Sequence, residues 1–182
     1  MTEKFEKTKA EIAEIISHSK TEEDSSHSIN AWQWLLKLKP DADEIVQLAI
    51  LAHDIERAQS DRLTQDMFDS YDEYKLAHAT RGGKIAAEIA MQNSYSEDEA
   101  NRLAEIIKWS EFGNDNPDVN LVMDSDSISY FDNNIESYLK RSGPKKTKNK
   151  MHFMFDRSSQ RAKDEIKKIL EAKPEFKKLM TY

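Results

Sequence analysis

Apolar residues recur along this chain at spacings of three and four, and alternation by two does not persist. This periodicity is typical of amphipathic helices. Polar stretches and Gly or Pro residues interrupt it and mark the expected helix ends. The predicted helices cover about 5–18, 26–39, 43–58, 72–91, 96–109, 119–140 and 148–171. The expected fold class is all-α, a single-domain compact helical bundle over residues 1–182.

The most apolar of these segments lies in the third predicted helix, over residues 45–52. A helix that is apolar nearly all round is usually buried at the centre of a fold. The dipeptide His53-Asp54 follows this segment directly. We therefore expect this pair to lie close to the core.

Composition narrows the class of protein further. The 182 residues suit one domain, and 4 Gly and 4 Pro are too few for a turn-rich all-β protein. Without cysteine, neither disulfides nor thiolate chemistry can contribute. The charged N-terminal segment does not resemble a signal peptide, and no apolar stretch approaches the roughly 18 residues that span a bilayer. We expect a cytoplasmic protein with no membrane partner.

The net charge of −7 limits which ligands the protein is expected to bind. A general nucleic-acid binder normally has a basic surface, so nucleic acid is an unlikely partner. A small phosphorylated substrate remains compatible with this charge, because a basic pocket can lie on an acidic protein.

Three of the five histidines occupy positions where helical spacing would suit leucine: His27, His53 and His78. A single histidine of this kind is usually a core residue with a hydrogen-bond partner. Three of them on successive predicted helices favour a shared site.

Asp54 lies beside His53 next to the most apolar segment, where an isolated carboxylate would be costly. A divalent cation would compensate for that cost. A further carboxylate comes from the sixth predicted helix, which offers Asp124 and Asp126. Asp126 is preferred because it lies four residues after Val122, on the apolar side. Asp124 remains the alternative, although near the helix start it could simply favour the macrodipole.

The ordered set of His27, then His53-Asp54, then an aspartate in a D-x-D-x-I-S context resembles the HD-domain superfamily of metal-dependent phosphohydrolases. The segments that carry the resemblance are SSHSINAW, LAILAHDIER, HATRGGKIAAEI and VMDSDSISYF, over about 26–131. The resemblance implies an all-helical metal-site core, with the last helix packed on it. The implied metal ligands are His27, His53, Asp54 and Asp126.

The chain matches the resembled family at one further histidine and departs from it at another. His78 matches a histidine that some members use for a second metal or for the substrate. Many relatives have a His-Glu pair after the fifth helix, whereas this chain has Ser110-Glu111 there. One ion is therefore expected. Four mixed His and carboxylate ligands leave room for water or phosphate at five- or six-coordinate ions, which favours Mn²⁺, Fe²⁺, Co²⁺ or Ni²⁺ over Zn²⁺ or Mg²⁺.

Two arginines are candidates for holding a phosphate. Arg81 follows His78 by three residues, and Gly82-Gly83 beside it leaves room for a ligand or for a closely packed helix. Arg57 follows His53 by four residues. For both, the alternative is an ion pair with a nearby carboxylate.

Other basic residues lie near the C-terminus. The lysines in 145–150 suit either a solvated loop or a mobile lid. Arg157 and Arg161 share a helix face that we interpret as structural unless the helix folds over the pocket.

The function expected from these residues is hydrolysis of a small phosphorylated metabolite, with a nucleotide as the preferred candidate, by a metal-activated water. Asp54, His78 and Arg81 would be the catalytic residues. One alternative is a non-catalytic HD module that binds a metal or ligand. Another is a di-iron oxygenase, which would need additional histidines. The sequence leaves the substrate, the identity of the metal and the oligomeric state open.

Overall fold

Helices account for all regular structure in residues 1–181, the part of the chain that the computed structural model describes, and these residues contain no strand. The all-α prediction is confirmed. The long helices are α1 (Glu3–Ser17), α2 (Asp24–Leu38), α3 (Glu44–Ala52), α4 (Tyr71–Gln92), α5 (Glu97–Trp109), α6 (Pro117–Ser129), α7 (Ile135–Asp156), α8 (Gln160–Ala172) and α9 (Pro174–Thr181). Short 3₁₀ turns are η1 (Ile55–Ala58) and η2 (Gln65–Met67), and η3 (Tyr130–Asn134) is a π-helical turn. Within residues 1–181, no helix is both long enough and apolar enough to span a membrane.

The helix starts follow from local capping signals. Ser70 and Ser96 each form a reciprocal capping box, with Glu73 at the start of α4 and with Glu99 at the start of α5. The Asp43 carboxylate accepts two backbone N–H groups at the start of α3. These starts agree closely with those predicted from the sequence.

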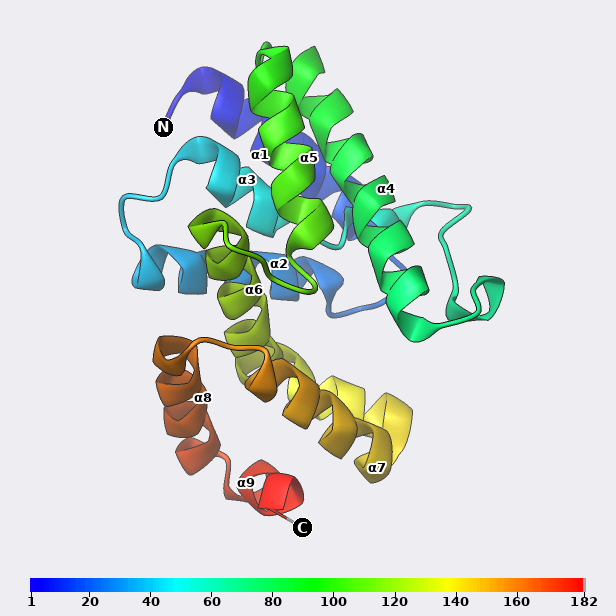
Figure 1. The fold of residues 1–182 in the computed structure, drawn as a ribbon, viewed down its shortest axis with the longest axis vertical. Helices are drawn as coiled ribbons and strands as arrows, with labels where there is room; N and C mark the ends of the chain where they lie inside the picture. The colour runs from blue at the N-terminus through cyan, green and yellow to red at the C-terminus, as the bar shows by residue number, and fades with distance from the viewer. Residues whose placement is uncertain (182) are drawn as a thin grey trace.

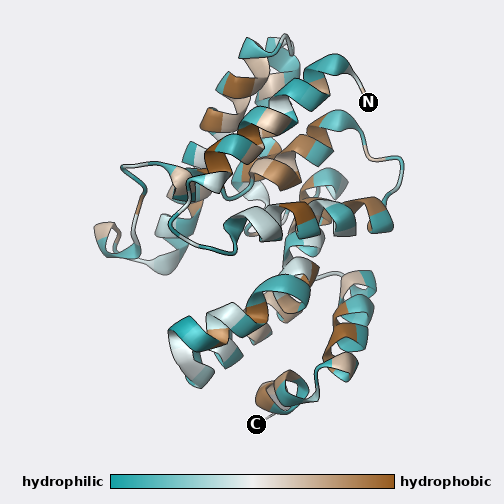
Figure 2. Cartoon of the chain, turned by 180° about the vertical axis from the view of Figure 1, so that it is seen from behind, coloured by the Kyte–Doolittle hydropathy of each residue, from teal (hydrophilic) through white to brown (hydrophobic). Residues whose placement is uncertain are grey.

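Two apolar clusters divide the molecule. The N-terminal region consists of α1 to α5, packed around α3 together with the first half of α6. The C-terminal region consists of η3 and α7 to α9, packed around Phe131 and Ile166 together with the second half of α6. Figure 1 shows α6 running from the blue-to-green region into the yellow-to-red region. Figure 2 shows the brown apolar segments turned inward in both.

Helices α4 and α5 approach each other at a glycine. A Cβ atom on Gly83 would lie 2.7 Å from the backbone oxygen of Ala104 on α5. Only glycine fits such a contact, so Gly83 serves close helix packing rather than ligand binding.

Three predicted boundaries are wrong. The third helix ends at Ala52 instead of running to 58. The sixth ends at Ser129, and the chain continues through the π turn into α7. At Gly143 (φ 77°, ψ 169°) the backbone of α7 is non-helical, so two helical segments meet there at a kink.

The last predicted helix, 148–171, is divided between α7 and α8. Asp124 on α6 accepts hydrogen bonds from the backbone N–H and the hydroxyl of Ser159, which caps α8. A tertiary contact therefore selects this helix start, and helical periodicity alone does not reveal it.

Candidate metal centre

His53 and Asp54 lie just beyond the C-terminal end of α3, where the chain turns into η1. The His53 ring donates from Nδ1 to the carbonyl of Ile50 at 2.7 Å. A continuing α-helix would have bonded that carbonyl to the N–H of Asp54. The unpaired carbonyls at a helix C-terminus carry partial negative charge, so this end of α3 favours a cation.

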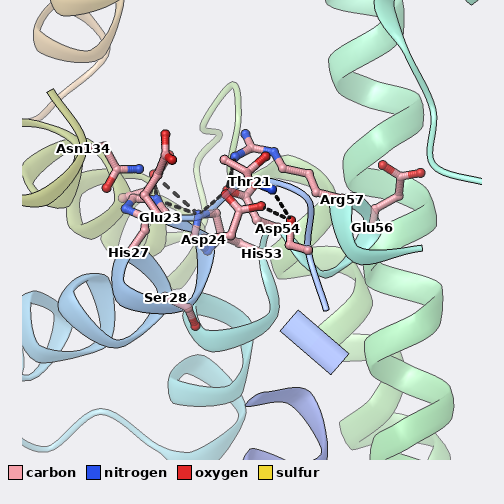
Figure 3. Close-up of polar contacts among 12 residues, drawn as sticks. Thr21, Glu23, Asp24, His27, Ser28, His53, Asp54, Glu56, Arg57 and Asn134 are labelled. Carbon is pink, nitrogen blue, oxygen red and sulfur yellow. Dashed lines mark hydrogen bonds and ion pairs between the residues drawn. The ribbon is translucent and has the colours of Figure 1, made fainter. Parts of the chain in front are cut away.

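His27, from α2, faces His53. The two Nε2 atoms are 3.2 Å apart, and the rings meet edge to face with centroids 5.1 Å apart. His27 Nδ1 lies 2.9 Å from the hydroxyl of Ser129, and that hydroxyl also donates to the His27 carbonyl. The end of α6 thus fixes the orientation of the His27 ring. Figure 3 shows His53 between His27 on one side and Asp54 on the other.

Asp126, and not Asp124, completes the group. Asp126 Oδ1 lies 2.9 Å from His27 Nε2 and 3.5 Å from His53 Nε2. Asp124 instead caps α8 through Ser159. Asp126, which we preferred because its spacing from Val122 places it on the apolar side of α6, is thus the aspartate that lies beside the two histidines.

The spacing of these atoms suits one ion. The ligand atoms of His27, His53 and Asp126 all lie within 4.8 Å of one another. Asp54, the fourth expected ligand, is not in this group, although its Oδ2 is 3.4 Å from His53 Nε2. Ligands held about 2.1 Å from one ion lie about 3.0 Å apart along an octahedral edge and about 3.4 Å apart along a tetrahedral edge. The distances from 2.9 to 3.5 Å match these edges.

The protonation pattern also suits a cation. Since the Ile50 carbonyl can only accept, His53 keeps a proton on Nδ1, so a bound cation would meet the ring at Nε2. The Ser129 hydroxyl gives its proton to a carbonyl, so His27 donates from Nδ1, and its Nε2 faces the Asp126 carboxylate, where a proton or a cation has to lie between them. The Nε2 atoms of His27 and His53 converge on the Asp126 carboxylate, and a divalent cation could replace the protons between them. Oriented imidazoles of this kind are typical of metal ligands.

Without a bound cation, the surrounding carboxylates favour a positive charge here, and His53 carries it as a second proton. Burial lowers the pKa of His53, but the carboxylates of Asp54 and Asp126 outweigh burial and raise this pKa to about 9. Burial raises the pKa of Asp126, but Arg157 and the two histidines hold it well below the usual range. Both aspartates are therefore ionised and able to bind a cation.

Asp54 is also bonded to an arginine. Arg57 Nη1 lies 2.7 Å from Asp54 Oδ2 and 3.3 Å from the buried carboxylate of Asp24 on α2. Of the two interpretations of Arg57, the ion pair is present, and the side chain also lines the cavity described below. Asp24 was not identified from the sequence.

His78, from α4, lies on the other side of Asp54. Its Nδ1 donates to Glu56 Oε2 at 2.8 Å, and its Nε2 is 3.4 Å from Asp54 Oδ1. Glu56 is turned toward α4, as Figure 3 shows. The Glu56 side chain is thus buried and orients His78.

Arg81 has contacts different from those expected. Its guanidinium pairs with Glu56 and with Asp61, and it also donates to the Asp61 carbonyl at 2.8 Å. These contacts hold the segment between α3 and α4. Arg81 is not among the described residues that line the cavity beside the histidines. The phosphate contact predicted for it has no support in this geometry.

A second group of buried charges surrounds Glu111. This carboxylate pairs with Lys75 from α4 and with Arg157 from the end of α7. Burial raises its pKa, but Lys75 and Arg157 outweigh burial and hold it at about 2. Ser110, at the position of the histidine in the resembled family, bonds to the Ile107 carbonyl. Lys75, the partner of Glu111, lies three residues before His78 and therefore shares its face of α4.

Arg157 links the two groups. It donates to the carboxylates of Asp126 and Glu111 and to the Ser127 hydroxyl. The end of α7 does fold over the site, which was the condition set for a role of Arg157. Arg161, by contrast, is exposed and bonds to the Lys37 carbonyl.

A cavity of about 340 Å³ opens beside these residues, between the two regions. The N-terminal region contributes His27, Asp54 and Arg57 to its lining, and the C-terminal region contributes Tyr130 and Lys150. Its volume is within the range of small-molecule sites. Of the lysines in 145–150, only Lys150 lines the cavity, and it does so from within α7 rather than from a loop.

Two further residues that line the cavity, Lys75 and Tyr130, were not identified from the sequence. Lys75 precedes His78 by three residues and therefore shares its face of α4. Tyr130 follows the D-x-D-x-I-S motif directly, but its position depends on the π turn, a feature often found at functional sites. No sequence pattern that we considered predicts that turn.

Comparison with known families gives one match. A family model described as a domain of unknown function (DUF4202) matches residues 3–180. Neither the curated proteins nor the solved structures give a match. Because the matched residues span almost the whole chain, the protein belongs to the DUF4202 family.

Proposed function

We propose that this protein is a metal-dependent phosphohydrolase that acts on a small phosphorylated metabolite such as a nucleotide. The observation that carries the proposal is the convergence of the Nε2 atoms of His27 and His53 with the Asp126 carboxylate, beside which Asp54 Oδ2 lies 3.4 Å from His53 Nε2. This donor set agrees with the resemblance to the HD-domain superfamily. It suits Mn²⁺, Fe²⁺, Co²⁺ or Ni²⁺, with Zn²⁺ or Mg²⁺ as the other candidates.

The cavity supports an anionic substrate. Arg57, Lys75 and Lys150 line it together with the ligand residues. Cationic side chains beside a metal site favour a phosphoryl group, whose charge they share with the ion. A protein that only stored a metal would not need such an arrangement.

Each residue has a defined role in this proposal. A bound divalent ion supplies Lewis acidity and lowers the pKa of a water molecule. Arg57 stays bonded to Asp54 and presents its remaining N–H groups to the phosphoryl oxygens. Asp54 Oδ1 and His78 Nε2, 3.4 Å apart, would pass on the proton that a water molecule loses, because Glu56 holds the other His78 proton on Nδ1.

The test combines metal analysis with phosphate release. The purified protein is assayed for bound metal and then screened against nucleotides and sugar phosphates with each candidate ion. We expect His53→Ala to lose both metal and phosphate release. His18→Ala, which changes an exposed histidine outside the site, should lose neither. The proposal fails if no ion supports phosphate release or if His53→Ala retains wild-type release.

The direct attack of water is tested separately. Hydrolysis in ¹⁸O-water should place the label in the released phosphate. A trapped phosphoryl-enzyme would contradict this mechanism, while leaving the metal assignment to be judged by metal content.

A further inference from the structure

The wall of the cavity formed by η3 and α7 has polar groups that the proposed hydrolysis does not use. Tyr130 ends the D-x-D-x-I-S-Y segment in η3, and Lys150 lies on α7. Both side chains line the cavity that contains His27 and Asp54. They belong to the region opposite α3, so they can contact a part of the ligand other than its reacting group.

The Tyr130 hydroxyl is buried and has no hydrogen-bond partner within the described residues. The side chain is 3 % exposed, and its ring packs edge to face against Phe131 and Tyr138. Burial and the neighbouring Tyr138 raise the pKa of Tyr130, so its hydroxyl remains protonated and can donate. A buried hydroxyl without a partner is costly, and a ligand atom would supply the partner.

Lys150 is a cation without a paired carboxylate. Each of three other cavity cations pairs with an acid: Arg57 with Asp54, Lys75 with Glu111, and Arg141 with Glu23. For Lys150, the described residues provide the Phe153 ring, 5.1 Å from Nζ, and no carboxylate within 4.0 Å.

The surroundings of Lys150 destabilise its positive charge. Burial and the positive charge of Lys75 lower its pKa to about 7, and Arg157 adds to this effect. Glu111 and Asp126 oppose the decrease without cancelling it. An anion bound at this wall would therefore stabilise the ammonium group.

We propose that Tyr130 and Lys150 form a subsite for a second anionic group, so that the ligand is a small molecule with two anionic groups, such as a bisphosphate. One group lies at the cluster of His27, His53, Asp54 and Asp126, and the other lies at the η3–α7 wall. This inference rests on the proposed function for the placement of the first group. It adds the requirement that a single-anion ligand binds more weakly than a double-anion ligand of the same length.

Non-hydrolysable phosphonates test this by binding alone. Calorimetry on the full chain with Mn²⁺ would compare alkylphosphonates with α,ω-bisphosphonates of two to six carbons. We expect one chain length at which the wild-type protein prefers the bisphosphonate at least tenfold. Lys150→Met and Tyr130→Phe should each reduce that preference at least threefold. Tyr130→Phe should not lower the melting temperature, because it removes a hydroxyl that has no partner.

Matched controls separate binding from folding. Lys145→Met removes an exposed lysine from the same helix and should leave the preference unchanged. Tyr95→Phe removes a hydroxyl that donates to Glu44 at 3.1 Å, so it should lower stability but not binding. If Lys150→Met does not fold, Lys150→Gln replaces it.

The outcomes distinguish this inference from the proposed function. A wild-type preference below tenfold at every length overturns the subsite, as does a reduction below threefold in either variant. Phosphate release without the preference would leave the hydrolase proposal intact. The preference without phosphate release from any substrate would support the subsite and reject hydrolysis.

Discussion

The N-terminal and C-terminal regions bury their residues in different ways. In α3, every residue from Ile45 to Ala52 is buried, so the N-terminal region packs around a fully enclosed helix. In α8, only Ala162, Ile166 and Leu170 are buried, so this helix of the C-terminal region covers the core with one face. A helix packed on all sides holds its end residues in fixed positions, whereas a helix packed on one face leaves polar residues available.

The two regions also contribute different groups to the candidate site. The N-terminal region supplies the imidazoles of His27 and His53, held by the carbonyl of Ile50 and by the end of α6. The C-terminal region supplies Arg157, which neutralises Asp126, together with the polar wall of the cavity. The candidate metal ligands therefore depend on the deep core, while charge compensation depends on the covering helices.

The largest effect is expected at the aspartate that joins the two regions. Asp126→Ala should remove the metal and lower phosphate release by about 10³-fold or more, because metal-assisted hydrolysis is then lost. Asp124→Ala is the matched control on the same helix, and it should keep the metal while costing about 1–2 kcal/mol as a lost cap of α8. Metal content and kcat/KM decide this. A full metal content in Asp126→Ala would contradict the division of roles.

The next effect concerns the arginine from the covering helices. Arg157→Ala would leave the carboxylates of Asp126 and Glu111 without this cation and should cost about 3–5 kcal/mol of unfolding free energy. Arg161→Ala, four residues further on, should cost less than about 0.5 kcal/mol because that side chain is exposed. Urea denaturation of both variants measures the difference. Equal costs would show that the C-terminal region does not stabilise the charges of the site.

A smaller effect depends on pH. The pKa of Glu111 is lowered from 4.5 to about 2, so its ionised form stabilises the fold by about 3 kcal/mol. This stability is fully present above pH 4.5 and is lost as the pH falls toward 2. The unfolding free energy of the wild type should therefore decrease more steeply between pH 5 and 2 than that of Glu111→Gln. If the unfolding free energies of the wild type and Glu111→Gln fall in parallel with pH, the ion pairs of Glu111 do not contribute this stability.

The smallest effect is expected within the N-terminal region, away from the cavity. Arg81→Ala breaks partly exposed ion pairs with Glu56 and Asp61 and should cost about 1 kcal/mol. Metal content should be unchanged, and kcat/KM should remain within about threefold of the wild type. A tenfold loss of kcat with full metal content would instead restore the phosphate contact predicted from the sequence.

Much of the fold could be predicted because helical periodicity and capping residues are local. Capping by Ser70 and Ser96, and the apolar segment that became α3, are properties of neighbouring residues in the chain. The break between α7 and α8 could not be predicted in this way, since Ser159, which caps α8, is held by hydrogen bonds to Asp124 on another helix. The same holds for the end of α3, where the His53 ring bonds to the carbonyl of Ile50.

The helical class and the grouping of His27 and His53 with Asp126 could be predicted from the sequence, because polar side chains at apolar spacings need a shared partner. Which charged residues surround this group could be seen only in the folded chain. Arg157 reaches Asp126 across 31 positions of the chain, and Arg81 is held by Glu56 instead of lining the cavity. Long, flexible cationic side chains can pair with any carboxylate within reach, and only the packing of distant helices selects which one that is.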